Sequence, residues 1–486
     1  MSVMSPPRST STPTRGRSVV EERPLRHPDD SAPAMMSRRA WWLVASNFLL
    51  PGSAQTLAGN RRLGRVGLVA TIVMWVLLAA AVLLGLMWRS LLTSIVASAW
   101  TLTGAQILLW IYAALWVVLT IDTLRLVRLS RVPGRTRAAA TVVALVLALV
   151  PASAAAYTAQ SVIAPLRSGL SIFASGPSVP PSDGYYNFLL LGADSGQGRD
   201  SMRFDSISVV SVNAESGAVT IFGIPRDLRH VPFSDGPMHD LYPNGFEGHA
   251  GQTCGWSSGI NQLMNAVETC RDDRGKSLYP DAAAQNSTPA VEATKDAAEG
   301  ILGIKIPYHV FIDMHGFADL VDALGGVTIT VKERLPEGPG PRYHDQPAEE
   351  WATGWIEKGK QHMDGQTAQW YARSRYTTSD WDRMRRQREL QTAILAQATP
   401  STVVTRFSEI VAAGKNLVQT DIPDSLLPFL VDLGAKAKDQ KVQDLELTPK
   451  GVNIDPDNPT SADWQKIRGM ADGLLHPPTP APSTAP

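Results

Sequence analysis

The sequence predicts an α/β protein in which three transmembrane helices precede one layered α/β/α domain with a central mixed sheet. Two observations predict this fold. Three uncharged, mostly apolar runs lie early in the chain, and each has the ~20 residues that a bilayer core of roughly 30 Å requires. Beyond them, short β-branched runs alternate with helical patterns, which is typical of helices packed on a sheet.

The apolar runs lie at 67–88, 104–121 and 138–157. A buried helix of a soluble domain is the alternative reading of any one run, but three in succession favour membrane spans. Arginines gather before the first run and between the second and third, at Arg61, Arg62, Arg65, Arg125, Arg128, Arg131, Arg135 and Arg137. By the positive-inside bias these parts are cytoplasmic, so the sequence predicts a multi-pass protein of the cell membrane with an extracellular domain.

The N-terminal part is predicted to be cytoplasmic and not to cross the membrane. Residues 1–40 are rich in Ser, Pro and Arg and predict a disordered tail. The apolar segment 41–59 is interrupted by polar and helix-breaking residues, among them Asn47 and Gln55. A further span here would move the arginines that follow it to the outside, so we interpret the segment as re-entrant or interfacial.

One domain is predicted at 185–475, after a linker at 158–184 and before a disordered Pro-rich tail at 476–486. Its predicted strands are 186–192, 206–212, 218–224, 308–314 and 327–331. Its predicted helices are 257–268, 290–302, 316–326, 364–373, 380–398 and 424–437. The Gly-, Pro- and Asp-rich stretches 232–256 and 271–289 are interpreted as loops that carry specificity.

The overall charge argues against a nucleic-acid partner. The 486 residues include 45 basic and 45 acidic side chains, so the formal net charge is zero and no overall basic field exists. Both cysteines, Cys254 and Cys270, fall in the part predicted to be external, where disulfides persist. We predict that they pair; two unrelated buried thiols are the alternative.

Acidic and basic residues stand at the ends of the predicted strands. Asp194 follows the first strand and Asp205 precedes the second, so neighbouring strands would bring both carboxylates to one edge, which suits Mg²⁺ or Mn²⁺. Turn capping by each acid is the alternative. Arg203 lies two residues before Asp205 and points the same way on an extended segment. Arg226 and Asp227 follow the third strand, either as active-site groups or as a strand-end ion pair.

The stretch 372–390 holds six arginines in nineteen residues. Arginine binds oxyanions through two N–H groups at once, so the stretch predicts an anion site. The candidates to face the anion are Arg373, Arg375, Arg383 and Arg386, with Gln387 beside them. Arg385 and Arg388 point elsewhere and are predicted to lie on the solvated surface.

Seven motifs occur in order within about 185–400. They are LLLGAD, RFDS, GIPRD, GIN, LGIKIPYHVFIDMHGFADLVDALGGVTITV, GKQHMDGQTAQWYARSR and DWDRMRRQ. Together they resemble the catalytic domain of LytR-CpsA-Psr proteins, which are membrane-anchored enzymes of Gram-positive and actinobacterial envelopes. The resemblance implies that a glycopolymer moves from a polyprenyl-pyrophosphate carrier to a muramic acid hydroxyl of peptidoglycan, forming a phosphodiester.

The resemblance also implies roles for individual residues. Asp194 and Asp205 resemble the Mg²⁺-binding acids. The arginines that resemble the pyrophosphate-binding set are Arg203, Arg226, Arg373, Arg375, Arg383 and Arg386, with Gln387 near them. Asp227 or one of the metal ligands would accept the proton of the attacking hydroxyl. Gly259 stands where the family usually has a lysine, so that lysine's role is absent or moved.

Other functions remain open at this point. A polyprenyl-pyrophosphate hydrolase would use the same site with water as the acceptor. A non-catalytic lipid- or glycan-binding envelope protein would not need the acids and arginines together. A regulator that binds nucleic acid would need the arginines inside the cell, against the predicted topology. The polymer could be arabinogalactan or teichoic acid, and the three spans and basic second loop favour an actinobacterial envelope.

Overall fold

The computed structural model describes residues 25–26, 28, 32–96, 98–164, 173–174, 176–193, 203–343, 345–374, 376, 378–397, 406, 418–437 and 440–477. The chain divides into two compact units, one of residues 1–89 with 103–163 and one of residues 90–102 with 164–486. The first unit holds the long apolar helices and the second holds the central sheet.

Long helices contain the three predicted apolar runs, apart from Trp88 at the end of the first run. They are α3 (Arg61–Met87), α5 (Ala99–Val127) and α6 (Gly134–Tyr157), with the short helices α4 (Arg89–Val96), η1 (Leu129–Arg131) and η2 (Thr158–Ile163) beside them in the sequence. Within the described part of the chain, three helical stretches are long and apolar enough to cross a membrane, at Arg61–Met87, Trp100–Arg131 and Gly134–Ile163. The predicted linker therefore begins after Ile163, because helical turns continue past Tyr157.

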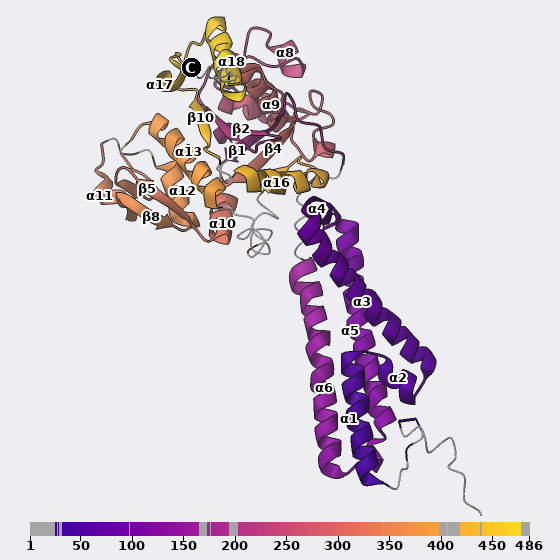
Figure 1. Cartoon of the computed structure of the whole chain (residues 1–486). Helices are drawn as coiled ribbons and strands as arrows, with labels where there is room; N and C mark the ends of the chain where they lie inside the picture. The colour runs from indigo at the N-terminus through magenta and orange to yellow at the C-terminus, as the bar shows by residue number, and fades with distance from the viewer. Residues whose placement is uncertain are drawn as a thin grey trace, which may run out of the picture. The chain divides into compact units, whose positions relative to one another are not determined.

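The predicted boundary of the disordered tail is wrong. Residues 33–40 are helical, since α1 runs over Pro33–Leu49, with the proline in its first turn where a missing N–H costs nothing. Met36, Ala40 and Leu43 are fully buried on one face of α1, which packs beside α6 (Figure 1). The last eight of the forty residues predicted to be a disordered tail are therefore helical with one apolar face. The average composition of the tail, rich in Ser, Pro and Arg, does not reveal this face.

The polar residues of the segment 41–59 have partners in α5. Asn47 of α1 donates to the hydroxyl of Thr120 at 3.5 Å. Gln55 of α2 (Ser53–Ala58) donates to the carbonyl of Leu119 at 2.8 Å and to the hydroxyl of Thr123 at 3.0 Å. These bonds pair the amide N–H groups of Asn47 and Gln55 among apolar helices, so the polar residues that interrupt the apolar run make interhelical contacts.

The second unit is built on a six-stranded mixed sheet in the order β10-β3-β2-β1-β4-β9. The strands are β1 (Tyr185–Ala193), β2 (Phe204–Asn213), β3 (Val219–Ile224), β4 (Tyr308–Asp313), β9 (Val418–Thr420) and β10 (Gln443–Glu446). β1, β2 and β3 form an antiparallel meander, while β1 with β4 and β3 with β10 are parallel. The central mixed sheet predicted from the sequence is confirmed.

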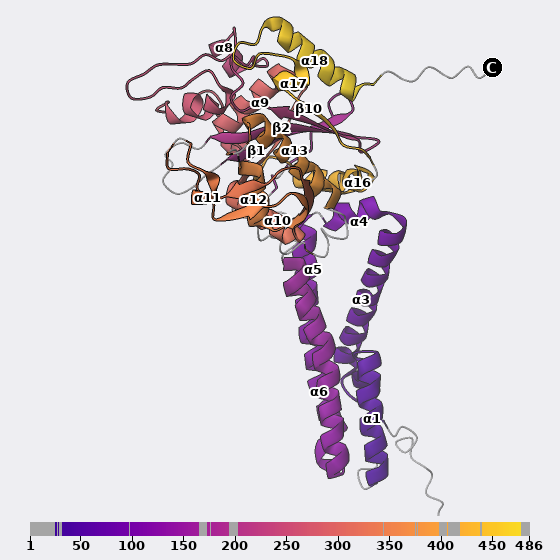
Figure 2. The same ribbon diagram turned by 90° about the vertical axis from the view of Figure 1, so that its left-hand side faces the viewer.

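Helices cover both faces of this sheet (Figure 2). Along β1, Leu189 and Leu191 belong to the core under α9 (Pro289–Leu302) and α18 (Ser461–Leu475), whereas Phe188 belongs to the core under α16 (Leu427–Ala437). This alternation follows from the two-residue period of a strand. The layered α/β/α arrangement is therefore confirmed.

The predicted strand 327–331 is not part of the central sheet. It is β5 (Val327–Val331), and it pairs with β8 (Gly359–Met363), while β6 (Leu335–Glu337) pairs with β7 (Gly354–Ile356). These ribbons pack with α10 (Met314–Leu324), α12 (Gly365–Arg373) and α13 (Asp380–Gln397) around a second apolar core. A β-branched run predicts a strand, but which strand it pairs with depends on packing against residues that are remote in the sequence.

The remaining elements are short. They are α8 (Pro237–Leu241), η3 (Ile260–Gln262), η4 (Asn265–Thr269), η5 (Ala283–Gln285), α11 (Ala348–Trp351), η6 (Asp424–Leu426) and α17 (Pro449–Val452). The predicted helix 257–268 is present as one helical stretch over 260–269, in which η3 and η4 are joined by Leu263 and Met264. Cys254 and Cys270 form a disulfide with their Cα atoms 5.7 Å apart, which ties the loop before this stretch to its end.

Candidate active site

Three elements bring charged side chains together at one end of the central sheet. Asp205 lies in β2, Arg226 follows β3, and Asp380 begins α13. β2 and β3 are antiparallel, with Ile207 opposite Ile224, so the start of β2 lies beside the end of β3. Asp205 and Arg226 are therefore neighbours at this end of the sheet, and α13 adds its first turn to them. The predicted approach of Asp194 to Asp205 stays a prediction, because Asp194 lies outside the described residues.

Arg226 is the centre of this group. Its Nη1 lies 2.5 Å from Oδ1 of Asp205, its Nε 3.3 Å from Oδ2 of Asp227, and its Nη2 3.7 Å from Oδ1 of Asp380. Arg383 extends the group, since its Nη2 lies 2.9 Å from Oδ2 of Asp380. We call these five residues the Arg226 cluster.

The Arg226 cluster holds three carboxylates and two guanidinium groups, so its formal charge is minus one. Burial lowers the pKa of Arg226, but Asp227, Asp205 and Asp380 together raise it above the usual value, so this group stays charged. An anion would need further positive charge to bind here. Arg203 can supply some of it, because it lies just before β2, is exposed, and has no ion pair among the residues that the structure describes.

Asp227 is oriented by a chain of amides that sequence reasoning missed. Asn261 donates to Oδ1 of Asp227 at 3.0 Å, Gln262 donates to Asn261 at 3.3 Å, and Asn265 donates to Gln262 at 3.0 Å. All three amides are buried, while the side chain of Asp227 is 65% exposed. The motif GIN marks the segment, but only the fold shows that its Asn261 meets Asp227.

Arg386 does not face an open anion site, which corrects the prediction for this residue. Its side chain is 2% exposed and donates to the carbonyl of Tyr371 at 3.0 Å, to the carbonyl of Ser374, and to the hydroxyl of Thr378 at 3.1 Å. Burial lowers the pKa of Arg386. Arg386 therefore joins α13 to the end of α12, where the last orphan carbonyls need donors.

Arg388 is not on the surface, which corrects a second prediction. Its side chain is 5% exposed, and its Nε lies 3.1 Å from Oε1 of Glu446 in β10. Burial lowers the pKa of Arg388 and raises that of Glu446, because both charges are removed from water. Arg385 is 42% exposed and lies 3.1 Å from Asp382, as expected for a surface arginine.

The other predicted site residues are only partly described. Arg373 is half-buried at the end of α12, with its guanidinium carbon 5.5 Å from the ring centroid of Trp370. Gln387 donates to the carbonyl of Ala372 at 3.5 Å. Asp194 and Arg375 lie outside the described residues.

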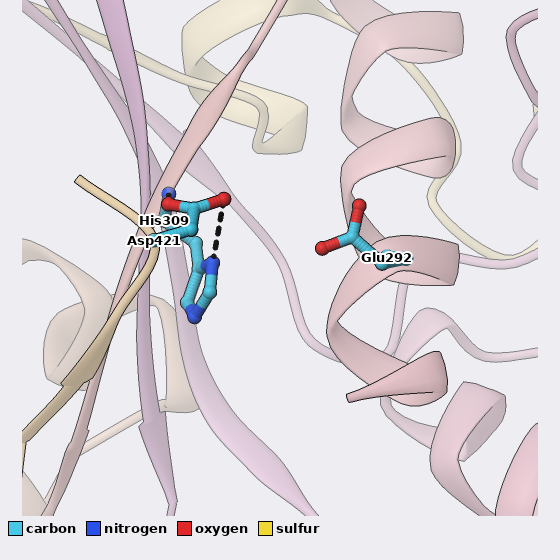
Figure 3. A group of neighbouring side chains, drawn as sticks. All are labelled: Glu292, His309 and Asp421. Carbon is cyan, nitrogen blue, oxygen red and sulfur yellow. Dashed lines mark hydrogen bonds and ion pairs between the residues drawn. The ribbon is translucent and has the colours of Figure 1, made fainter. Parts of the chain in front are cut away.

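A second group of possible metal ligands lies away from the Arg226 cluster. Glu292, His309 and Asp421 gather between α9, β4 and the end of β9, with Nδ1 of His309 3.1 Å from Oδ2 of Asp421 (Figure 3). The ammonium group of Lys295 contacts Asp421 and lies 3.1 Å from Oε1 of Glu292. Lys295 therefore already supplies the positive charge, and the group is a buried tie between helix and sheet.

Comparisons with known proteins extend the resemblance noted from the motifs. The LytR_cpsA_psr family model matches residues 167–274 and 275–468. Biofilm regulatory protein A of Streptococcus mutans is 26% identical over 292 residues, which is 58% of this chain and 61% of that protein. The polyisoprenyl-teichoic acid–peptidoglycan teichoic acid transferase TagU of Halalkalibacterium halodurans is 26% identical over 274 residues, 55% of this chain and 71% of TagU.

Solved structures are also similar. The crystal structure of TagV from Bacillus subtilis has a TM-score of 0.40 and 21% identity, covering 60% of this chain and 97% of that chain. This chain spans less than two thirds of the length of the Streptococcus mutans protein. The family match itself runs from the segment before β1 into α18 and covers more than half of the chain. The protein therefore belongs to the LytR-CpsA-Psr family.

Proposed function

We propose that this protein transfers a glycopolymer from a polyprenyl-pyrophosphate carrier to a muramic acid hydroxyl of peptidoglycan. The observation that carries the proposal is the Arg226 cluster, in which β2, β3 and α13 gather carboxylates and guanidinium groups at one end of the sheet. The printed name of TagU, a transferase of polyisoprenyl-linked teichoic acid to peptidoglycan, supports the same class of reaction.

The reaction exchanges one bond at phosphorus for another. The muramic hydroxyl oxygen forms a bond to the phosphorus that carries the polymer, and the bond from that phosphorus to the polyprenyl phosphate breaks. Negative charge grows on the phosphoryl oxygens and the leaving phosphate, so fixed guanidinium groups lower the barrier. Arg226 and Arg203 would contact these oxygens, and Arg373 and Arg375 would add positive charge.

Asp227 is the residue we assign to the proton of the attacking hydroxyl. Its carboxylate is 65% exposed, so a sugar hydroxyl can reach it. The amide of Asn261 holds one oxygen at 3.0 Å and leaves the other directed to Arg226 at 3.3 Å. A carboxylate in a fixed orientation next to the phosphorus can accept the proton as the new bond forms.

A divalent cation fits the chemistry of the site. Asp205 presents a half-buried carboxylate with one oxygen bound to Arg226, and the cluster carries an excess of negative charge. Oxygen ligands of this kind suit Mg²⁺ or Mn²⁺, so we propose that Asp205 and Asp194 hold one of these ions. When bound, the ion would neutralise charge on the pyrophosphate oxygens.

The test is Arg226→Ala, assayed with a polyprenyl-pyrophosphate-linked saccharide as donor and nascent peptidoglycan as acceptor. We expect transfer to fall by about 10²–10³-fold, since a charge that stabilises the transition state is lost. Arg385→Ala is the matched control, because Arg385 is a surface arginine of α13, and its rate should stay within about twofold of wild type. Full activity of a folded Arg226→Ala variant would refute the assignment, and equal turnover without acceptor would indicate a hydrolase.

We also propose that the protein is a multi-pass protein of the cell membrane whose sheet domain lies outside. The three apolar helices and the arginine-rich loop before Gly134 support this orientation. A reporter fused after residue 477 should be active only in the external compartment. The transferred polymer would be teichoic acid or arabinogalactan, in a Gram-positive or actinobacterial wall. Sugar analysis of the wall purified from a deletion strain would identify the polymer by the sugar that is missing.

A further inference from the structure

A polar cavity of about 740 Å³ is lined by residues that begin at His230, three positions after Asp227. None of its lining residues belongs to the Arg226 cluster. The loop around α8, the end of α9 and the first half of α18 form its walls. Its volume is in the range of about 300–1,000 Å³ that is usual for small-ligand sites.

The charged groups that line the cavity are mostly paired within the protein. The ammonium group of Lys305 lies 2.9 Å from Oε2 of Glu299, and the guanidinium of Arg468 donates to the carbonyl of Gly300 at 3.0 Å. Asp235 is exposed at the rim. Because two acids oppose two bases, the cavity offers no net charge to an ion.

Its uncharged polar groups, in contrast, have bonds to spare. The hydroxyl of Ser234 is buried and has no partner among the described residues. The side chains of His230, His239, Asn244 and Gln465 also line the cavity and make no hydrogen bond with any other described residue. Such groups can each donate to or accept from a hydroxyl, which is the hydrogen-bonding character of a sugar.

Rings stand next to these polar groups. Trp464 and Phe233 line the cavity and are otherwise buried in the core. Both rings are less than a tenth exposed, so they form an apolar part of the wall and present no free ring face to a sugar. Sugar recognition by this cavity therefore depends on the polar groups, which can bind hydroxyls.

The cavity is within reach of the reacting groups. His230 follows Asp227 by three residues, so their Cα atoms lie at most about 11 Å apart, even for an extended chain. His230 has a left-handed backbone (φ 50°), and its carbonyl lies against Gly245, where a Cβ would come within 2.6 Å. Backbone of this kind persists where surrounding structure holds it and is frequent at binding sites.

We propose that this cavity binds a stretch of neutral polysaccharide whose reacting end lies at Asp227. This inference rests on the proposed function for its substrate class. The sugar rings can belong to the backbone of the acceptor strand or to a neutral segment of the donor polymer, since both present the same hydroxyl chemistry.

The experiment is isothermal titration of the full chain in detergent with three probes. Chitotetraose stands for the acceptor backbone, a galactan tetrasaccharide for a neutral polymer, and a glycerol phosphate oligomer for a charged one. We expect a neutral probe to bind, and the one that binds identifies the source. The double variant His230→Ala/Gln465→Ala should weaken that binding by about tenfold, the effect of two lost hydrogen bonds. Lys466→Ala, next to Gln465 on the exposed side of α18 and not in the cavity lining, should leave it unchanged.

Transfer kinetics separate this inference from the proposed function. The double variant should raise KM for the glycan and leave kcat unchanged, because it removes binding that is equal in the ground and transition states. Arg226→Ala should keep the sugar binding and lose transfer. Binding without transfer in the wild type would retain the cavity assignment and reject the transferase. Equal binding by wild type and double variant, or binding of the charged probe alone, would overturn the assignment.

Discussion

Glu446→Ala should destabilise the protein because it leaves a buried arginine without its partner. Glu446 and Arg388 are 3.1 Å apart, and their side chains are 16% and 5% exposed. Removing one partner of a buried pair typically costs 3–5 kcal/mol, since the remaining charge keeps its desolvation penalty. Arg388 would keep its contact with Gln391, which favours the lower half of this range.

The measurement is thermal unfolding of the full chain in detergent. A loss of about 3–4 kcal/mol in a large domain corresponds to a fall in Tm of about 6–16 °C. Glu357→Ala is the control, because Glu357 pairs with Arg334 at 2.9 Å on the surface and should shift stability by less than about 1 kcal/mol.

A double variant tests the physical reason. Arg388→Met/Glu446→Leu removes both charges and should recover most of the lost stability, because apolar residues of similar volume can replace a buried pair. The reasoning would be refuted if Glu446→Ala unfolded within about 1 °C of wild type, or if the double variant were less stable than Glu446→Ala.

Three further predictions concern pH, the disulfide and the site. Burial raises the pKa of Asp296 to about 6 from 3.8, so the free energy of unfolding of the wild type falls as pH rises from about 4 to 6. Asp296→Asn does not titrate, so its stability relative to the wild type should rise by up to about 3 kcal/mol over that interval in thermal melts. The same dependence of stability on pH in both proteins would contradict this. Cys254→Ser/Cys270→Ser should lower stability by about 3 kcal/mol, as expected for a loop of 16 residues, and dithiothreitol should affect wild type but not the variant. Asn261→Ala should lower kcat of transfer about tenfold with unchanged donor KM, because it frees the carboxylate of Asp227; an unchanged kcat would exclude this orienting role.

The sequence predicts the parts of the site that depend on strand ends. Short β-branched runs identify β2 and β3, and Asp205 and Arg226 stand at their ends. The two residues meet because the strands are antiparallel, which the sequence alone does not show. Asp380 lies in the first turn of α13, where an acid is favoured, but its contact with Arg226 depends on packing that the sequence does not show.

Burial of charge on α13 could not be predicted from the sequence. Arg386 and Arg388 lie about 200° apart around the helix, so a pattern with one apolar face places at least one of them in water. Both are buried, because α12 supplies carbonyls on one side and β10 supplies Glu446 on the other. These partners are remote in the sequence, and a helical period does not identify them.

Both edge strands of the central sheet come from the last quarter of the chain, and this affects how the domain is completed. The meander of β1, β2 and β3 can form early from local contacts, but the outer edge of β3 stays unpaired until β10 is available. An open edge of this kind promotes association between chains. A shortened chain that ends after α13 would hold most of the predicted catalytic residues and still be prone to aggregate. The C-terminal segment that contains β10 therefore keeps the domain soluble by covering the edge of β3.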